Sequence, residues 1–212
     1  MTFEEVLEKA EGITRDYVFY SPSQIIRGDD KLNDPTKGER AWAVPRSTGE
    51  WLHDLVEISK PMRILELGTS LGYSTLWLAH AAHRYGGQVD TIELVERKVS
   101  IARELAADAE LDNITFHTGT IFTTLTNLTG LYDLVFMDAD RGNYLAYLPR
   151  ILELLSPVGI LIADNALMQK ESMRAFIDHM KSRSDFKTDI LDQDNGILFA
   201  RRITDPAVNH NN

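Results

Sequence analysis

Short apolar runs alternate with amphipathic helical segments from residue 46 to residue 183, and this alternation constrains the fold more than any other feature. The pattern predicts strands at 63–67, 89–93, 114–117, 131–137 and 159–163. It predicts helices at 47–58, 73–84, 96–110, 121–128, 143–155 and 169–183. Apolar strands separated by helices are typical of a parallel sheet that is covered on both faces.

Two further strands, at 186–191 and 197–202, follow one another around a short turn. Adjacent strands joined in this way predict an antiparallel hairpin. The predicted fold is therefore α/β, with a doubly wound, mostly parallel, seven-stranded sheet and a C-terminal antiparallel hairpin.

The N-terminal part, residues 1–45, differs from the regular remainder, residues 46–212. Residues 3–19 predict an amphipathic helix whose apolar face either packs on its own domain or serves a homodimer. Residues 20–45 are rich in Ser, Pro, Gly, Asp and Asn, so they predict an irregular segment. Such a segment is either a surface connector or a lid over an acceptor site. We predict one globular unit, in which residues 46–212 form the α/β domain and residues 1–45 add the N-terminal helix and the irregular segment.

Composition excludes several classes of function. The chain of 212 residues has no cysteine, which excludes disulfides, thiolate metal sites and a cysteine nucleophile. The net charge is -10 and the longest basic run is Arg201–Arg202, so no nucleic-acid partner is expected. The sequence has no apolar run of about 18 residues and no signal-peptide pattern, which makes a cytoplasmic location without membrane contact the expectation.

Ligands of doubly wound sheets bind beyond the carboxyl ends of the strands, so the residues there are the candidate site. The first strand ends in Glu66-Leu67-Gly68, and a second glycine, Gly72, precedes the next helix. Gly68 allows a ligand to approach the backbone, and Glu66 would attract the ammonium group of an amino-acid ligand. Glu93 ends the second strand and can accept hydrogen bonds from both hydroxyls of a ribose. Together these residues favour an adenosine-type ligand.

The ends of the fourth and fifth strands carry Asp138 and the pair Asp164–Asn165. Three hard oxygen side chains that converge from neighbouring strands suit Mg²⁺, with Ca²⁺ or Mn²⁺ as alternatives. An Asp in such a position can also simply cap the following helix. The coincidence of all three favours a metal site.

These motifs resemble the class I S-adenosylmethionine-dependent, cation-dependent O-methyltransferases of the caffeoyl-CoA and catechol type. The resemblance covers residues 42–202 and rests on ILELGTSLGYSTLWLA, VFMDADRGNY and LIADN. It implies a Rossmann-like methyltransferase fold, a homodimer and a metal held by Asp138, Asp164 and Asn165. It also implies cofactor contacts from Val44, Glu66, Gly68, Thr69, Ser74, Glu93, Thr120 and Asp140, with Trp42 closing over cofactor and acceptor.

The chain departs from the family at three places. The family lysine of DADK is Arg141, the frequent Gly-Asp-Ala after the third strand is Gly119-Thr120-Ile121, and no aromatic residue follows Asn165 closely. The implied reaction transfers a methyl group to a hydroxyl of a small catechol-like acceptor, with Asp138 and Arg141 as catalytic residues. Arginine is a poor base because its pKa lies far above neutral pH, so we expect Arg141 to stabilise the phenolate or to contact an anionic substrate.

Three other functions stay open at this point. One is methylation of a hydroxylated nucleoside in RNA, and another is a non-catalytic cofactor-binding role that only Arg141 suggests. An NAD-dependent dehydrogenase is disfavoured by Glu66 and by the missing third glycine of the dinucleotide motif.

Overall fold

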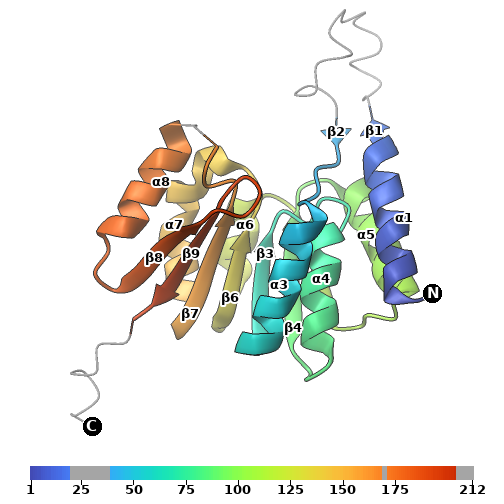
Figure 1. Ribbon diagram of the computed structural model, residues 1–212, viewed down its shortest axis with the longest axis horizontal. Helices are drawn as coiled ribbons and strands as arrows, with labels where there is room; N and C mark the ends of the chain where they lie inside the picture. The colour runs from blue at the N-terminus through green and yellow to red at the C-terminus, as the bar shows by residue number, and fades with distance from the viewer. Residues whose placement is uncertain (20–38, 169–170, 204–212) are drawn as a thin grey trace, which may run out of the picture.

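A seven-stranded sheet forms the centre of the computed structural model, which describes residues 1–19, 39–168 and 171–203 (Figure 1). Its strands are β3 (Arg63–Leu67), β4 (Gln88–Glu93), β5 (Ile114–Thr118), β6 (Tyr132–Met137), β7 (Leu155–Asp164), β8 (Phe186–Leu191) and β9 (Ile197–Arg202). They lie in the order β5-β4-β3-β6-β7-β9-β8. The first five are parallel, and β9 runs antiparallel to both β7 and β8. The predicted doubly wound sheet with its C-terminal hairpin is confirmed.

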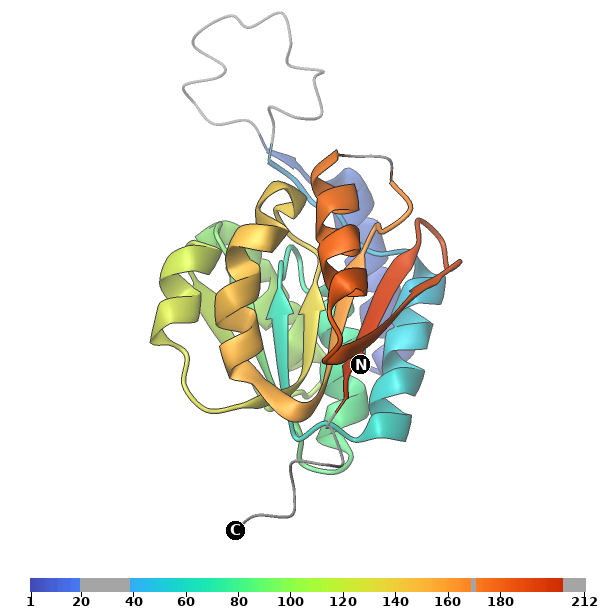
Figure 2. The ribbon, with the colours of Figure 1, turned by 90° about the vertical axis from the view of Figure 1, so that its left-hand side faces the viewer.

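Helices cover both faces of this sheet (Figures 1 and 2). One face carries α1 (Phe3–Asp16), α3 (Arg46–Ser59), α4 (Tyr73–His83) and α5 (Glu96–Asp108). The other carries α6 (Ile121–Asn127), α7 (Tyr144–Leu154), which the 3-10 turn η1 (Arg141–Asn143) precedes, and α8 (Glu171–Ser182). Each helix layer therefore has its own apolar core against one side of the sheet. Every helix in the described residues is too short or too polar to cross a membrane.

The side chains of β3 point alternately into the two apolar cores. Leu65 and Leu67 pack into the core with α7 and α8, whereas Ile64 packs into the core with α3 and α4. Side chains alternate along a strand, so Glu66 points to the same face as Ile64, toward α4. The strand that leads into the candidate site thus places a carboxylate inside the protein.

Helix α1 is shorter than the predicted helix 3–19 because it ends at Asp16. Tyr17 is extended, and β1 (Val18–Phe19) pairs antiparallel with β2 (Glu39–Arg40). Aromatic and β-branched residues favour an extended strand, which explains why the helical pattern stops there. Residues 20–38 of the predicted irregular segment lie outside the described residues.

The apolar face of α1 packs on its own domain, one of the two alternatives that its pattern allowed. Val6, Leu7 and Ala10 are fully buried in the core shared with α3, α4 and α5. A homodimer stays a prediction, and it would use another surface.

Strand β7 begins at Leu155, four residues before the predicted start at residue 159. Leu155 pairs with Tyr132, and the register then shifts before Leu134 pairs with Ile160. Pro157 and Gly159 resemble a turn in the sequence, but here they occupy the irregular part of a strand.

Candidate active site

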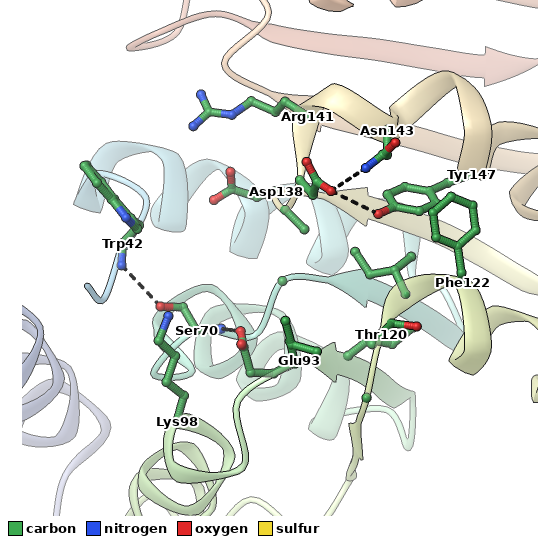
Figure 3. A pocket seen from close by; sticks show the side chains of 17 residues that line it. Trp42, Ser70, Glu93, Lys98, Thr120, Phe122, Asp138, Arg141, Asn143 and Tyr147 are labelled. Atoms are coloured by element: carbon green, nitrogen blue, oxygen red, sulfur yellow. Dashed lines mark hydrogen bonds between the residues drawn. The ribbon is translucent and has the colours of Figure 1, made fainter. Parts of the chain in front are cut away.

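A cavity of about 490 Å³ opens beyond the carboxyl ends of β3, β4 and β6 (Figure 3). Strand β3 lies between β4 and β6, so this is the point where the chain order in the sheet reverses. Doubly wound sheets bind ligands at such a point. The cavity is lined by Trp42, Gly68, Ser70, Ile92, Glu93, Leu94, Lys98, Gly119, Thr120, Ile121, Phe122, Asp138, Ala139, Asp140, Arg141, Asn143 and Tyr147.

The turn after β3 brings the chain close to β4 and β6. The backbone N–H groups of Gly68 and Thr69 both donate to the carbonyl oxygen of Ile92, at 3.0 and 3.1 Å. Gly68 has a φ of +106°, which L side chains rarely adopt. The predicted role of Gly68 in a tight turn beside the ligand fits this geometry, and Gly68 lines the cavity.

Glu93 lines the cavity and holds two loops together. One carboxylate oxygen accepts a hydrogen bond from the Ser70 N–H at 2.9 Å, and the other accepts one from the Val95 N–H at 3.0 Å. Ser70 Oγ in turn accepts a hydrogen bond from the Trp42 N–H at 3.2 Å. Glu93 therefore stands at the cavity wall with a fixed orientation, ready to accept further hydrogen bonds.

Glu66 lies behind the cavity wall and is fully buried. Its carboxylate accepts hydrogen bonds from the hydroxyls of Ser74 and Thr91, each at 2.6 Å, and from that of Thr75. Burial raises the pKa of Glu66 despite these three donors. Neither Glu66 nor Ser74 lines the cavity, so their direct contact with a cofactor stays a prediction.

Two other predicted cofactor residues are also covered. Thr69 is buried, and its hydroxyl lies 2.6 Å from that of Thr91. Val44 is buried in the core beside α4. For both residues the cofactor contact stays a prediction.

The wall opposite Glu93 is apolar and aromatic, and sequence reasoning missed most of it. Phe122 and Tyr147 form an edge-to-face pair with ring centroids 4.6 Å apart. Thr120 lines the cavity as predicted, and its side chain also caps α6 by accepting from the Thr123 N–H at 3.2 Å.

Asp140 lies on the same wall and is held by two partners. Its Oδ2 accepts a hydrogen bond from Asn143 Nδ2 at 2.5 Å and one from the Tyr147 hydroxyl at 3.4 Å. Tyr147 follows Asp140 by seven residues, which is two helical turns. That spacing is the sequence signal that could have found Tyr147.

The three predicted metal ligands lie together. The amide nitrogen of Asn165 donates to Asp138 Oδ1 at 3.2 Å and to Asp164 Oδ2 at 2.7 Å. Across the described residues, no group of three or more His, Cys, Asp and Glu side chains could hold a metal ion. The candidate ligands here are two carboxylates and one amide.

The two carboxylates lie in a poorly solvated place. Burial, and then the nearby charge of Asp164, raise the pKa of Asp138 to about 7. Burial also raises the pKa of Asp164. One partly exposed carboxylate, Asp138, and one buried carboxylate, Asp164, lie together here with under-compensated negative charge, which fits a divalent cation that supplies positive charge.

Arg141 begins the 3-10 turn η1 and points toward the same place (Figure 3). Its Nη1 donates to the thioether sulfur of Met168 at 2.9 Å. Its positive charge acts against burial and lowers the pKa of both Asp138 and Asp164. A thioether is a weak acceptor, so the guanidinium keeps most of its hydrogen-bonding capacity.

The family model described as O-methyltransferase matches residues 33–197 of this chain. The chain belongs to the O-methyltransferase family. It is a methyltransferase that depends on S-adenosylmethionine.

Relatives agree with this assignment. The methyltransferase is 28% identical over 168 residues to a catechol O-methyltransferase from Niastella koreensis, across 77% of this chain and 75% of the relative. It is 34% identical over 127 residues to a catechol O-methyltransferase from Mycobacterium tuberculosis, across 59% of this chain and 57% of the relative. The second match thus spans little more than half of that relative.

Solved structures have the same fold. A methyltransferase from Geobacter sulfurreducens has a TM-score of 0.74 and 28% identity, over 94% of this chain and 90% of that one. An O-methyltransferase from Bacillus cereus in complex with SAH has a TM-score of 0.71 and 25% identity, over 95% of this chain and 100% of that one.

Proposed function

We propose that the methyltransferase transfers a methyl group to one hydroxyl of a small catechol-like acceptor and that it needs a divalent cation, Mg²⁺ in the first place. The observation that carries this proposal is the grouping of Asp138, which lines the cavity, with the buried side chains of Asp164 and Asn165. The names of the two relatives, both catechol O-methyltransferases, support it.

The cation would be held by Asp138, by Asp164 and by Asn165 through its amide oxygen. When bound, it would hold two vicinal oxygens of the acceptor and lower the pKa of the attacking hydroxyl. The Asn165 amide nitrogen lies within hydrogen-bond distance of both carboxylates, so the Asn165 side chain stands beside both of the other candidate ligands. The three side chains fit the group because they supply oxygen ligands and two negative charges.

Arg141 would stabilise the anion that forms on the acceptor. It lies on the cavity wall next to Asp138, and its planar guanidinium can donate two parallel hydrogen bonds. It would not act as the base, because a guanidinium stays protonated in proteins and has no proton-accepting site to offer. The role of Arg141 would therefore be electrostatic. The attacking oxygen of the acceptor would also need an in-line approach to the methyl carbon.

The rest of the cavity would hold S-adenosylmethionine. Glu93 would accept hydrogen bonds from the ribose hydroxyls. The apolar wall of Ile121, Phe122 and Tyr147 offers aromatic and aliphatic surface against which the adenine ring would pack. Gly68 and Asp140 line the same cavity as Glu93 and Asp138.

The test compares matched acceptors in the presence of Mg²⁺. We expect methyl transfer to 1,2-dihydroxybenzene and its derivatives, and no transfer to phenol or to 1,3-dihydroxybenzene, because only vicinal hydroxyls can share one cation. Equal rates on phenol would contradict the metal-bridged arrangement. Methylation of RNA nucleosides, with none of these small acceptors modified, would favour the alternative function.

A further inference from the structure

The turn between β8 and β9, residues 192–196, packs directly on the loop that carries the candidate metal ligands. The Gly196 carbonyl accepts a hydrogen bond from the Ala166 N–H, and the Asn195 carbonyl accepts one from the Leu167 N–H, both at 2.8 Å. A Cβ atom on Gly196 would stand only 2.3 to 2.8 Å from atoms of Leu167. The turn and the loop after Asp164–Asn165 therefore form one packed unit.

The same turn reaches across to the beginning of α3 through Asp194. Its Oδ1 and Oδ2 accept hydrogen bonds from Ser47 Oγ at 2.9 and 2.8 Å, and its Oδ2 accepts another from Thr48 Oγ1 at 2.6 Å. Thr48 is fully buried, so its hydroxyl depends on an internal partner. The hydrogen bonds from Thr48 and Ser47 hold the pKa of Asp194 below its usual range.

Asp194 also lies beside the first turn of α3, where it binds the hydroxyls of Ser47 and Thr48. Pro45 occupies the N-cap position of α3 and makes no side-chain hydrogen bond there. A carboxylate near the first turn of a helix is stabilised by the unpaired N–H groups and the dipole. The backbone of Asp194 has a φ of +49°, an uncommon conformation for a residue other than glycine. A strained residue at this place points to a role for its side chain.

The start of α3 leads back to the cavity. Trp42 lies four residues before Arg46, the first residue of α3, and it lines the cavity together with Asp138 and Arg141 (Figure 3). Between them, Val44 is buried in the core, which anchors the intervening chain. A shift at the beginning of α3 would therefore move the Trp42 segment relative to the metal ligands.

We infer that Asp194 is a positioning residue for the acceptor. By joining the start of α3 to the loop after Asp164–Asn165, it sets the distance between the Trp42 wall and the metal ligands. Asp194 is not among the residues that line the cavity, so it acts through these two segments. The inference rests on the proposed function, because it assumes that an acceptor lies between Trp42 and the metal ligands.

The test uses an acceptor with two inequivalent vicinal hydroxyls, such as 3,4-dihydroxybenzoate. The ratio of the two monomethylated products reports how the acceptor is oriented, and it does not depend on how much enzyme is folded. Asp194→Gly removes the carboxylate and relieves the positive φ, so the turn itself should persist. Asp192→Gly, in an exposed position of the same turn, is the matched control.

We expect Asp194→Gly to change the product ratio by about twofold or more and to raise the acceptor KM by about three- to tenfold, because small misplacements are costly in transfer reactions. The Kd of S-adenosylmethionine should stay within about twofold of the parent, since Asp194 touches no lining residue of the ribose side. Asp194→Asn keeps an oxygen acceptor and should recover part of the parent ratio. Asp192→Gly should behave as the parent.

Hydrogen exchange provides a second measurement, which does not depend on methyl-transfer activity. Hydrogen exchange of the amides at residues 46–49 should become faster in Asp194→Gly than in Asp192→Gly, because the start of α3 loses the hydrogen bonds that join Ser47 and Thr48 to the turn. An active Asp194→Gly enzyme with the parent's product ratio and acceptor KM would overturn the inference and leave the proposed function intact. A parent protein that methylates no catechol would overturn the proposed function first, and this inference with it.

Discussion

The carbonyl oxygen of Asp138 lies directly behind Gly68, and a Cβ atom on Gly68 would stand 2.4 Å from it. No carbon and oxygen atoms can approach so closely without a shift of backbone, and Gly68 also has a positive φ. The turn after β3, which contains Gly68, therefore packs against the end of β6, which carries the candidate metal ligand Asp138. Only glycine fits at this point of contact.

Gly68→Ala should destabilise the protein by about 2–4 kcal/mol, because it adds a backbone clash to the conformational strain. Gly86→Ala is the matched control, since Gly86 has a φ of +83° but open space around a Cβ atom. It should cost only about 1–2 kcal/mol. Chemical denaturation of both variants checks the difference, and equal losses would show that the contact with Asp138 is unimportant.

Glu93→Ala should weaken S-adenosylmethionine binding about tenfold or more, because the loss of hydrogen bonds to a charged group costs about 1.5–3 kcal/mol. Glu96→Ala removes the same charge three residues away, from an exposed position at the start of α5, and should change the affinity little. Isothermal titration calorimetry measures both. Unchanged affinity in Glu93→Ala would reject the ribose assignment.

The stability of the metal-free protein should depend on Asp138 between about pH 4 and pH 7. The folded state raises the pKa of Asp138 from its ordinary value of 3.8 to about 7, so in this window the folded state binds the extra proton. Stability relative to Asp138→Asn should therefore fall as the pH rises, by at most about 1.4 kcal/mol per pH unit, and level off above the raised pKa.

Urea denaturation of the two proteins at several pH values tests this, with chelator present throughout. Saturating Mg²⁺ should flatten the difference, because a bound cation favours the ionised carboxylate. If the difference in unfolding free energy between the two proteins stays constant from pH 4 to pH 7, the pKa of Asp138 is not raised in the folded state.

Arg141→Lys should be neutral or mildly harmful for methyl transfer, since lysine offers a point charge where arginine offers two fixed N–H donors. Arg141→Ala should lose about 10²- to 10³-fold in kcat, because the forming anion loses its cation. The pH profile of the three proteins on one catechol is the measurement. A gain of about tenfold or more in Arg141→Lys would instead show that the family lysine acts as a base that this chain lacks.

Much of the fold followed from local pattern. The strands at 63–67, 186–191 and 197–202 have the predicted bounds, because apolar runs and turn residues mark them clearly. The helix ending at Asp16 and the early start of β7 were not predicted, since both depend on pairing with distant strands. Strand pairing can override a local preference that points elsewhere.

The candidate site was also predicted only in part from the sequence. Gly68, Glu93 and Asp138 were found because strand ends meet at one edge of a parallel sheet, whereas Arg141 was found through the family resemblance, and each of the four lines the cavity. The seclusion of Glu66 behind three hydroxyls was not foreseen, since it depends on which way β3 turns its side chains. The contact of Asp194 with Thr48 joins residues 146 positions apart, and no local pattern encodes such a contact.

The most direct test of the central claim is the cation dependence of catechol methylation after exhaustive chelation. The account predicts no product in the chelated protein, full recovery on addition of Mg²⁺, and no recovery in Asp164→Ala. Calorimetry should show Mg²⁺ binding to the parent and a loss of that binding in Asp164→Ala. Full methylation in the chelated protein, or an Asp164→Ala variant as active as the parent, would contradict it.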